Sequence, residues 1–392
     1  MATDSALRIA LLFDDSLDRN DGVQQYVKAL GAYYTSKGHV VTYLCGQTSK
    51  TDYQGAPIFS LAKNISVTYN HNRLTVPLWA SGRRIRRVLE ATEPDILHVM
   101  VPYSPVLAAK VIRRFKKYGP VVGTFHIMPS SGWSRFGNRL LGWWLRRNLR
   151  RFAWQVAVSA PAAQFAHETY GITADVVPNV VAVSSFKATP KRPVLAEGKA
   201  HVVFLGRLVR RKGCFELLQA LDLIRAQGQI NDIHVTILGD GQDRAALEQY
   251  AADHQLLSHV TFYGFVEEAD KAALLASADV AIFPSLGGES FGIVLLEAMA
   301  AGAGAVIGGN NPGYASVLEL CGTPEAIFTP QPTEIAHHIL QYSQHKAARQ
   351  ALHAKQQVAV HQFDVPIVAN RLLLRYRDAI ANYRSPADNT TV

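Results

Sequence analysis

Short apolar runs recur along the chain, and each is followed by a polar or glycine-containing loop and then by a segment with helical spacing. The first run covers residues 7–13, and a helix is expected from residue 23 to about residue 36, with Gly38 ending it. Further strands are predicted at residues 39–45, 95–100, 121–125, 155–159, 201–205, 234–238, 260–263, 279–283 and 304–307, with helical segments between them. This alternation is typical of a parallel, Rossmann-like sheet.

The alternation is interrupted at residues 177–199, where the composition shifts to Pro, Ser and Lys, as expected for a linker. A chain of 392 residues with 48% hydrophobic residues exceeds one ordinary core. We therefore expect two α/β domains of similar size, at residues 1–188 and 189–364, followed by a last helix at about residues 365–383.

The cysteines and the apolar runs indicate the cellular compartment in which the protein is expected. Cys45, Cys214 and Cys321 are too few and too far apart to predict a disulfide framework or a Cys-rich metal site. The first residues lack a basic segment before a long apolar core, and no later apolar run reaches membrane-spanning length without a charge or a helix breaker. We expect a cytosolic chain that is neither secreted nor transmembrane.

Positive charge is concentrated in the first half of the chain. Residues 1–188 carry 23 Lys and Arg against 11 Asp and Glu, whereas residues 189–392 carry 17 against 20, and the net charge is +9. A basic surface of this size predicts an anionic partner, either lipid headgroups or nucleic acid. The sequence has no recognition motif, zinc pattern or aromatic-basic sheet signature, so we expect no nucleic-acid partner.

Two segments carry much of this charge. Near the start of a predicted helix, apolar Ile85 and Val88 are surrounded by four arginines: Arg83, Arg84, Arg86 and Arg87. Residues 133–154 combine Trp and Arg on a predicted amphipathic helix, a composition typical of membrane interfaces, where Trp143 or Trp144 would insert. An ordinary helix with solvated arginines is an equally good interpretation of residues 133–154.

The stretch at residues 278–302 is the most informative part of the sequence. It predicts a short buried strand, a Gly-rich turn and a helix closed by Gly302, and ligands bind at this kind of strand end in open parallel sheets. The free N–H groups at the helix start favour a phosphate. Glu289 in the turn and Glu297 about two turns further on can accept hydroxyl hydrogen bonds from one elongated ligand. For either glutamate taken alone, a capping carboxylate or a solvated helix face is the better interpretation, because isolated acidic residues near helix starts are common.

Other strand ends carry further candidates. Arg207 and Lys212 lie in a strand-to-helix turn, where two cations can clamp a diphosphate, although basic loop residues are usually only solvated. His126 follows a predicted strand, and a lone His in such a place is more often structural than catalytic. Gly22 at a helix start lets the backbone approach a phosphate, and the glycine turn at residues 239–241 is a weak signal of the same kind.

The segments GGESFGIVLLEAM, GRLVRRKG, GTFH and DGVQQYV together resemble the retaining glycosyltransferases of family 4, which have the GT-B fold. The resemblance covers nearly the whole chain and is nearest to the phosphatidylinositol mannosyltransferases. It implies two Rossmann-like domains facing across a cleft, the first on the acceptor side and the second binding the nucleotide sugar. It also implies a C-terminal helix, within residues 365–392, that crosses back to the first domain.

The resemblance also assigns roles to residues. The catalytic set is His126, Arg207, Lys212 and Glu289. The donor-binding set is Gly22, Gly264, Phe265, Val266, Ser290, Phe291, Gly292, Ile293, Val294 and Glu297, and the membrane-binding set is Arg83, Arg84, Arg86 and Arg87. The chain departs from the family at Asp21, where a first glycine would stand, and in GGNNPGYA after residue 307.

The implied activity is transfer of a hexose, mannose from GDP-mannose in the first instance, to a phosphatidylinositol-type lipid at the inner face of the plasma membrane. A UDP-sugar donor with a soluble acceptor, or a non-catalytic protein that binds lipid or nucleotide sugar, are the alternatives. No tightly bound cofactor is expected. The sequence has no Asp-x-Asp metal motif near the expected cleft, so the charge of the leaving diphosphate is assigned to Arg207, Lys212 and helix N-terminal amides. A divalent-metal requirement and the oligomeric state are left open.

Overall fold

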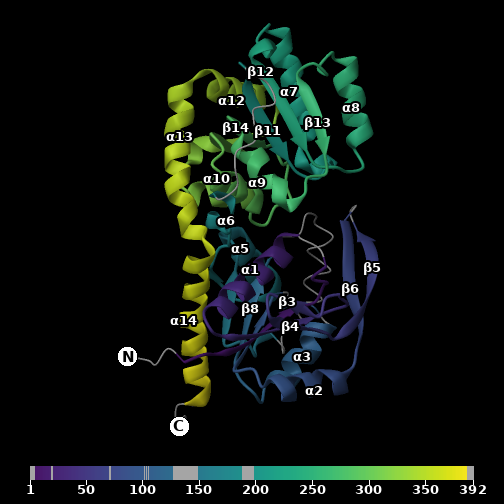
Figure 1. Cartoon of the computed structure of the whole chain (residues 1–392), viewed down its shortest axis with the longest axis vertical. Coiled ribbons are helices and arrows are strands. Elements are labelled where there is room, and N and C mark those ends of the chain that lie inside the picture. The colour runs from purple at the N-terminus through teal and green to yellow at the C-terminus, as the bar shows by residue number, and fades with distance from the viewer. Residues whose placement is uncertain are drawn as a thin grey trace. The chain divides into compact units, whose positions relative to one another are not determined.

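The computed structural model describes residues 5–18, 21–69, 72–100, 102, 104, 106–126, 149–187 and 198–385. The chain forms two compact units (Figure 1), the first made of Met1–Val180 with Val365–Val392 and the second of Val181–Asp364. No helix in the described ranges is long and apolar enough to cross a membrane. All three cysteines are buried and carry free thiols.

The first unit is built on an eight-stranded sheet of order β10-β9-β8-β7-β1-β2-β4-β3, in which only the β3–β4 pair is antiparallel. Its elements are β1 (Arg8–Phe13), α1 (Gly22–Ser36), β2 (Val40–Cys45), β3 (Asp52–Tyr53), β4 (Ala56–Ser60), β5 (Ala62–Tyr69), β6 (Asn72–Ala80), α2 (Gly82–Thr92), β7 (Ile96–Val99), α3 (Leu107–Phe115), β8 (Val121–Phe125), β9 (Trp154–Ala157), α5 (Ala160–Tyr170), β10 (Asp175–Val176) and α14 (Val365–Arg384). Strands β5 and β6 form a separate antiparallel ribbon.

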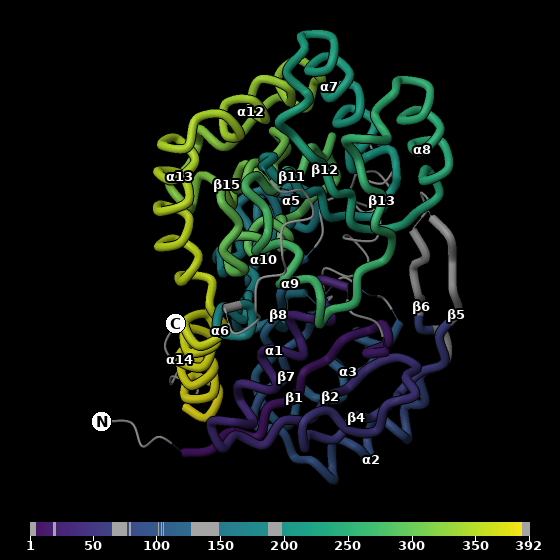
Figure 2. Tube along the Cα trace, turned by 45° about the horizontal axis from the view of Figure 1, so that its top comes forward, coloured from purple at the N-terminus to yellow at the C-terminus, as the bar shows by residue number. Residues whose placement is uncertain are grey.

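Helices cover this sheet because its central strands are apolar on both faces. Strand β1 has five of its six residues buried, and β7 is buried throughout, as expected of parallel strands inside a sheet. One core cluster joins Leu12 and Leu97 of these strands to Ile85 of α2 and to Val111 and Phe115 of α3. The C-terminal helix α14 packs beside α1 (Figure 2), so the last segment belongs to the first unit.

The second unit has a six-stranded parallel sheet of order β13-β12-β11-β14-β15-β16. Its elements are α6 (Val183–Lys187), β11 (Ala200–Leu205), η1 (Arg210–Lys212), α7 (Cys214–Ala226), η2 (Ile230–Asp232), β12 (Ile233–Leu238), α8 (Arg244–Asp253), β13 (Val260–Gly264), α9 (Glu268–Ala276), β14 (Val280–Phe283), α10 (Ile293–Ala301), β15 (Ala305–Gly309), α11 (Pro312–Leu320), η3 (Pro324–Ala326), β16 (Ile327–Phe328), α12 (Pro332–Gln344), α13 (Lys346–Ala359) and η4 (Val360–Phe363).

Each strand predicted from the sequence is present, within two residues at either end. A helix, α2, lies between the strands predicted at residues 39–45 and 95–100, but β3 to β6, within residues 52–80, precede it and were not predicted. There the chain adds edge strands and a ribbon before α2 restores the alternation. The helix after β14, which the apolar pattern predicts from residue 291, starts at Ile293, because Gly292 at φ +117 is its N-cap.

Candidate functional site

The turn between β11 and α7 carries the two cations that the sequence singled out. Residues Arg210–Lys212 form a single 3-10 turn, and Gly213 follows at φ +77. A Cβ atom at Gly213 would collide with the carbonyl oxygen of Pro284, so glycine lets this turn pack directly on the loop after β14. Backbone Leu286 N–H donates to the carbonyl of Arg211 at 2.8 Å, which joins the two loops.

Hydrogen bonds from Ser285 and Asn311 hold the loop after β14 in place and thereby position Glu289. Ser285 Oγ donates to the Glu289 carboxylate at 3.0 Å, and the Asn311 side chain donates to the carbonyl of Ser285 at 3.1 Å. Asn311 is also the N-cap of α11, accepting from Tyr314 N–H at 3.0 Å. At Gly313 a Cβ atom would strike the Glu289 backbone, so α11 begins in direct contact with this loop.

Glu289 is held in an ion-paired cluster. Its Oε1 atom lies 2.8 Å from Lys212 Nζ and accepts a hydrogen bond from Arg211 Nη1 at 2.6 Å. Burial alone would raise the pKa of Glu289, but the charges of Lys212 and Arg211 outweigh it, so the pKa lies below its ordinary value. Burial lowers the pKa of Lys212, partly offset by Glu289. Glu289 is therefore an ionised acceptor fixed in place.

The cluster keeps an excess of positive charge. Arg207 is exposed and makes no ion pair with any described residue, yet its charge is close enough to lower the pKa of Lys212. Arg210, in the same turn, instead pairs with Glu216 and lies over the Phe215 ring. One carboxylate facing three cations forms a site suited to a diphosphate.

Glu297 lies outside this cluster, in a buried ion pair of its own. Its Oε1 accepts from Lys271 Nζ at 2.6 Å, and Lys271 also lies 2.7 Å from Glu268 Oε1. Burial raises the pKa of Glu297, partly offset by the charge of Lys271. The pKa of Lys271 is raised by Glu297 and Glu268 in spite of its burial. The predicted ribose acceptor thus already has a cationic partner from α9.

The remaining predicted donor-binding residues lie at the start of α10 and at the end of β13. Phe291 packs its ring against Phe363 and is buried, so only its backbone is available to a ligand. Ser290, Gly292, Ile293 and Val294 form the approach to α10 and its first turn. Strand β13 ends at Gly264 with φ +90, Val266 follows in the next loop, and Phe265 between them is 72% exposed. An exposed aromatic ring beside a strand end is well placed to flank a planar base.

In the first unit, His126 follows β8 and is buried. Burial lowers the pKa of His126 to about 3, so the imidazole is neutral at neutral pH. Its ring meets Tyr26 edge-on at 5.0 Å, and its Nε2 atom has no hydrogen-bond partner among the described residues. A neutral imidazole with one open nitrogen can exchange a hydrogen bond with a sugar hydroxyl.

A second buried histidine, His98 of β7, was missed by the sequence reasoning. Its Nε2 pairs with Thr124 Oγ1 at 2.6 Å, and its Nδ1 pairs with the hydroxyl of Tyr376 from α14 at 2.5 Å. Burial lowers the pKa of His98 to about 3. This network joins the C-terminal helix α14 to strands β7 and β8, and no periodicity in the sequence indicates it.

Helix α1 begins at Gly22, one residue before the predicted start at residue 23, and Asp21 is its N-cap. Asp21 has φ −75 in the extended region, so this backbone needs no glycine where the family pattern has one. The first turn of α1 contains no acidic residue. The exposed carboxylate of Asp21 nevertheless lies at the helix start, where its negative charge disfavours an anion, so the departure from the family pattern weakens the predicted phosphate contact at Gly22.

The four arginines of α2 are exposed, whereas Ile85 and Val88 on the same helix are buried. Ser81 caps the helix by accepting from the backbone N–H of Arg84. Most of the Trp/Arg segment at residues 133–154, including Trp143 and Trp144, lies outside the described residues.

Two family models match the chain. The model described as "Glycosyltransferase Family 4" matches residues 20–185, and that described as "Glycosyl transferases group 1" matches residues 185–357. The phosphatidyl-myo-inositol mannosyltransferase of Mycolicibacterium smegmatis is 30% identical over 375 residues, covering 94% of this chain and 93% of the relative. The protein of the same name from Mycobacterium leprae is 29% identical over 377 residues, covering 94% and 96%.

Solved structures share the fold at lower identity. A glycosyltransferase from Rickettsia africae superposes with a TM-score of 0.73 at 15% identity, covering 95% of this chain and 98% of its own. Anabaena HepE, solved in complex with UDP and glucose, has a TM-score of 0.70 at 19% identity and covers 95% and 99%.

Proposed function

Because this chain belongs to glycosyltransferase family 4, we propose that it transfers mannose from GDP-mannose to a phosphatidylinositol-type lipid, with retention at the anomeric carbon. The observation that carries the proposal is the Glu289 cluster, which joins a fixed ionised carboxylate to Lys212 and Arg211 beside the exposed Arg207. The similarity to phosphatidyl-myo-inositol mannosyltransferases, about 30% identical over 94% of the chain, supports the choice of sugar and acceptor.

In this proposal the second unit binds the donor. Arg207 and Lys212 neutralise the charge that develops on the diphosphate as the bond from the anomeric carbon to the phosphate oxygen breaks. Backbone N–H groups at the start of α10 add to this stabilisation. Glu289 accepts hydrogen bonds from the sugar hydroxyls, and Glu297 from the ribose. The new bond joins the anomeric carbon to the acceptor oxygen, and the acceptor proton passes to the departing phosphate oxygen.

The first unit supplies the acceptor side and the membrane contact. His126 offers a neutral imidazole to the donor sugar, and the exposed arginines of α2 hold the enzyme on an anionic surface at the cytoplasmic face. Each arginine near such a surface contributes on the order of 1 kcal/mol, so the four together support stable attachment that weakens as salt rises.

Steady-state kinetics tests the donor assignment. We expect Arg207→Ala and Lys212→Ala each to lower turnover by roughly a hundredfold, because each removes a cation that stabilises the leaving group. Arg210→Ala removes the same charge from the same turn and should leave turnover within about threefold, since Arg210 already pairs with Glu216. Equal turnover in all three variants would remove the diphosphate clamp from the proposal.

The acceptor assignment is tested separately, with phosphatidylinositol vesicles. Replacing the four α2 arginines with Ser should abolish most salt-sensitive vesicle binding and lower transfer to the lipid, while donor titration stays unchanged. If the wild-type protein does not bind anionic vesicles and glycosylates a soluble acceptor instead, the soluble-acceptor glycosyltransferase is the correct interpretation.

A further inference from the structure

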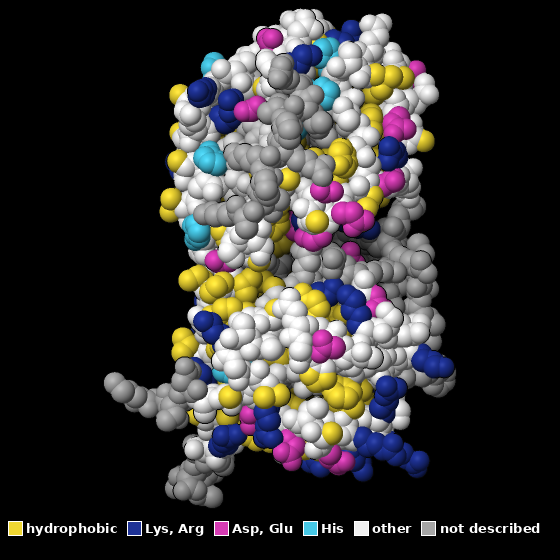
Figure 3. All heavy atoms as spheres, in the orientation of Figure 1, with side chains coloured by type: hydrophobic (Ala, Val, Ile, Leu, Met, Phe, Trp, Pro, Cys, Tyr) yellow, Lys and Arg dark blue, Asp and Glu magenta, His cyan; other side chains and the backbone are white. Residues whose placement is uncertain are grey.

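Six polar side chains form a buried layer in the first unit, where α1 and α14 meet strands β7 and β8. Each is at most 5% exposed, and they are Tyr26, Tyr34, His98, Thr124, His126 and Tyr376. We call them the tyrosine–histidine layer. Burial lowers the pKa of both histidines to about 3, so the layer carries no charge at neutral pH. The Lys and Arg side chains around α2, in contrast, lie on the surface (Figure 3).

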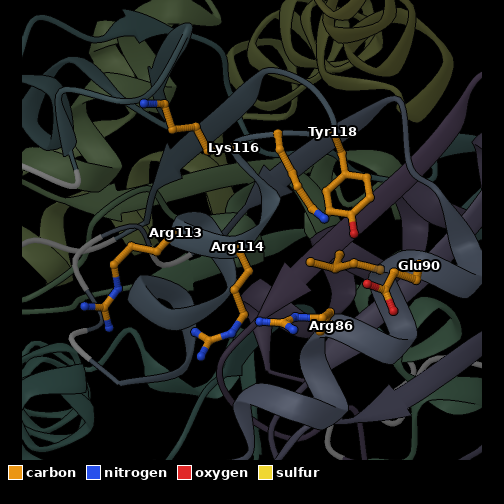
Figure 4. Close-up of a pocket in the computed structure, with 8 residues that line it drawn as sticks. Arg86, Glu90, Arg113, Arg114, Lys116 and Tyr118 are labelled. Atoms are coloured by element: carbon orange, nitrogen blue, oxygen red, sulfur yellow. The ribbon is translucent and has the colours of Figure 1, made fainter.

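Unpaired buried atoms alone do not mark a binding site in this unit. Beside the pocket of about 500 Å³ between α2 and the end of α3 (Figure 4), Arg114 Nε and the Tyr118 hydroxyl have no hydrogen-bond partner among the described residues. Both atoms are buried, and the Arg114 guanidinium packs against Gly82, where a Cβ atom would collide with it. They are therefore closed to a ligand. The tyrosine–histidine layer differs, because its contacts lead to His126, a residue of the proposed reaction.

The orientation of His126 depends on a side-chain contact. The residue follows β8 directly, one position beyond Phe125, the last residue that β8 pairs with β9. The sheet ladder therefore does not fix the imidazole. The ring of Tyr26 meets it edge-on, with the ring centroids 5.0 Å apart and an angle of 71° between the planes. This geometry is directional, because a ring edge is positive and a ring face is negative, so the contact favours one orientation of the imidazole.

Tyr26 is itself held in place. It is 1% exposed, and burial raises the pKa of its hydroxyl while the Thr124 hydroxyl opposes that rise, which places the two side chains together. Thr124 Oγ1 pairs with His98 Nε2 at 2.6 Å, and His98 Nδ1 pairs with the Tyr376 hydroxyl at 2.5 Å. His126 thus packs against a ring that has little freedom to move within a close-packed layer.

We propose that Tyr26 is a positioning residue for His126, whose ring edge holds the imidazole in the orientation that meets the donor sugar. The inference rests on the proposed function, in which His126 contacts that sugar. A group displaced by about 1 Å can lose roughly a hundredfold in rate, so the contact bears on kcat more than on donor affinity. If Tyr26 only filled space in the core, its loss would lower stability without a specific loss of kcat.

Tyr34 provides a matched control on the same helix. It lies about two turns after Tyr26, is buried, and meets Tyr376 edge-on at 6.0 Å, as Tyr26 meets His126. Tyr26→Leu and Tyr34→Leu remove the same side-chain volume from the layer, but only the first removes the ring contact with His126. Each variant is made in the wild-type and in the His126→Asn background, and kcat and the KM for the donor are measured after melting curves have shown that the proteins are folded. Tyr26→Met replaces Tyr26→Leu if the latter is unfolded, since Met adapts to irregular gaps in a core.

We expect Tyr26→Leu to lower kcat about tenfold or more and to leave the KM for the donor within about threefold, whereas Tyr34→Leu should leave kcat within about threefold. In the His126→Asn background, Tyr26→Leu should lower kcat by less than about twofold, because the two residues act through one contact. Tyr26→Phe keeps the ring edge and should retain kcat within about threefold of wild type. Equal losses of kcat in the two Leu variants, or a further loss of about tenfold in the His126→Asn background, would overturn the positioning role.

A readout without substrate separates this inference from the proposed function. Protein labelled only at histidine is studied by NMR, and the imidazole signal of His126 is assigned by its absence in His126→Asn. That signal should shift in Tyr26→Leu and stay in place in Tyr34→Leu, because ring currents act over short distances. An unchanged His126 signal in Tyr26→Leu would overturn the inference. A wild type that transfers no mannose to phosphatidylinositol, beside the expected shifts, would contradict the proposed function and leave the contact between Tyr26 and His126 in place.

Discussion

Asp14 follows β1 and gives the sharpest test of the buried electrostatics in the first unit. Its carboxyl group is buried, and neither oxygen lies within hydrogen-bonding geometry of a partner among the described residues. Burial raises the pKa of Asp14 from 3.8 to about 8, against a lowering contribution from the backbone of Ala108 and with a small further increase from the charge of Asp15. The folded protein therefore holds this proton more tightly than the unfolded chain does.

The magnitude follows from linkage. Below about pH 4 the carboxyl is protonated in both states, and its burial carries no penalty for charge. Each pH unit above that costs about 1.4 kcal/mol of folding free energy until the folded-state pKa near 8 is reached. At pH 7 the accumulated penalty is about 4 kcal/mol. The stability present at low pH is thus lost as pH rises, the opposite of the usual behaviour of a carboxylate.

Asp14→Asn removes the titration and keeps the shape of the side chain. Its amide is also buried without a partner, at a cost of about 1 to 3 kcal/mol that does not change with pH. We expect urea unfolding to show the variant gaining stability over wild type between about pH 5 and about pH 8, by about 1.4 kcal/mol per unit. Asp378→Asn, at a carboxylate 66% exposed, is the control and should show no such slope. A pH-independent difference for Asp14→Asn would refute the reasoning.

Three further outcomes are expected. Lys271→Met should destabilise the second unit by roughly 3 to 5 kcal/mol in urea unfolding, because it leaves Glu297 buried without its cation, and adding Glu297→Gln should recover part of the loss. Glu289→Gln should lower kcat, because the position of the sugar matters in the transition state. Glu297→Gln should mainly raise the KM for the donor, because the ribose is bound equally in the ground state and the transition state. Equal changes in kcat and in KM for the two variants would contradict this assignment of roles. Tyr376→Phe should lower the free energy of unfolding by roughly 1 to 3 kcal/mol, because the buried Nδ1 of His98 loses its hydrogen-bond partner. An unchanged melting curve would show that this hydrogen bond does not stabilise the packing of α14 on the sheet.

The fold was predictable because buried parallel strands are nearly continuous apolar runs in the sequence. Strands β1, β8 and β14 each end at the residue where the predicted strand ends. The predicted fold class, two Rossmann-like units of the GT-B type, is confirmed by the two parallel sheets and by the structural relatives. Strands β3 to β6 were missed, because alternation was extended across a segment that forms edge strands and a ribbon.

The ion pairs were harder to predict than the positions of the candidate residues. Arg211 had no assigned role in the sequence, and it meets Glu289 across 78 positions only because two loops pack through Gly213. Lys271 reaches Glu297 from the neighbouring helix α9. Such partners depend on which turns touch, and a sequence pattern carries no direct signal of that. The proposed roles of Arg207, His126 and the donor-binding residues remain predictions.

The central claim is transfer of mannose to a lipid with retention, and one measurement tests it directly. The wild-type protein is incubated with labelled GDP-mannose and phosphatidylinositol vesicles, and the labelled lipid is quantified and its anomeric configuration determined by NMR. The account predicts a mannosyl lipid with the configuration of the donor, formed by wild type and lost in Glu289→Gln. A lipid without label, an inverted product, or equal product from Glu289→Gln would contradict it.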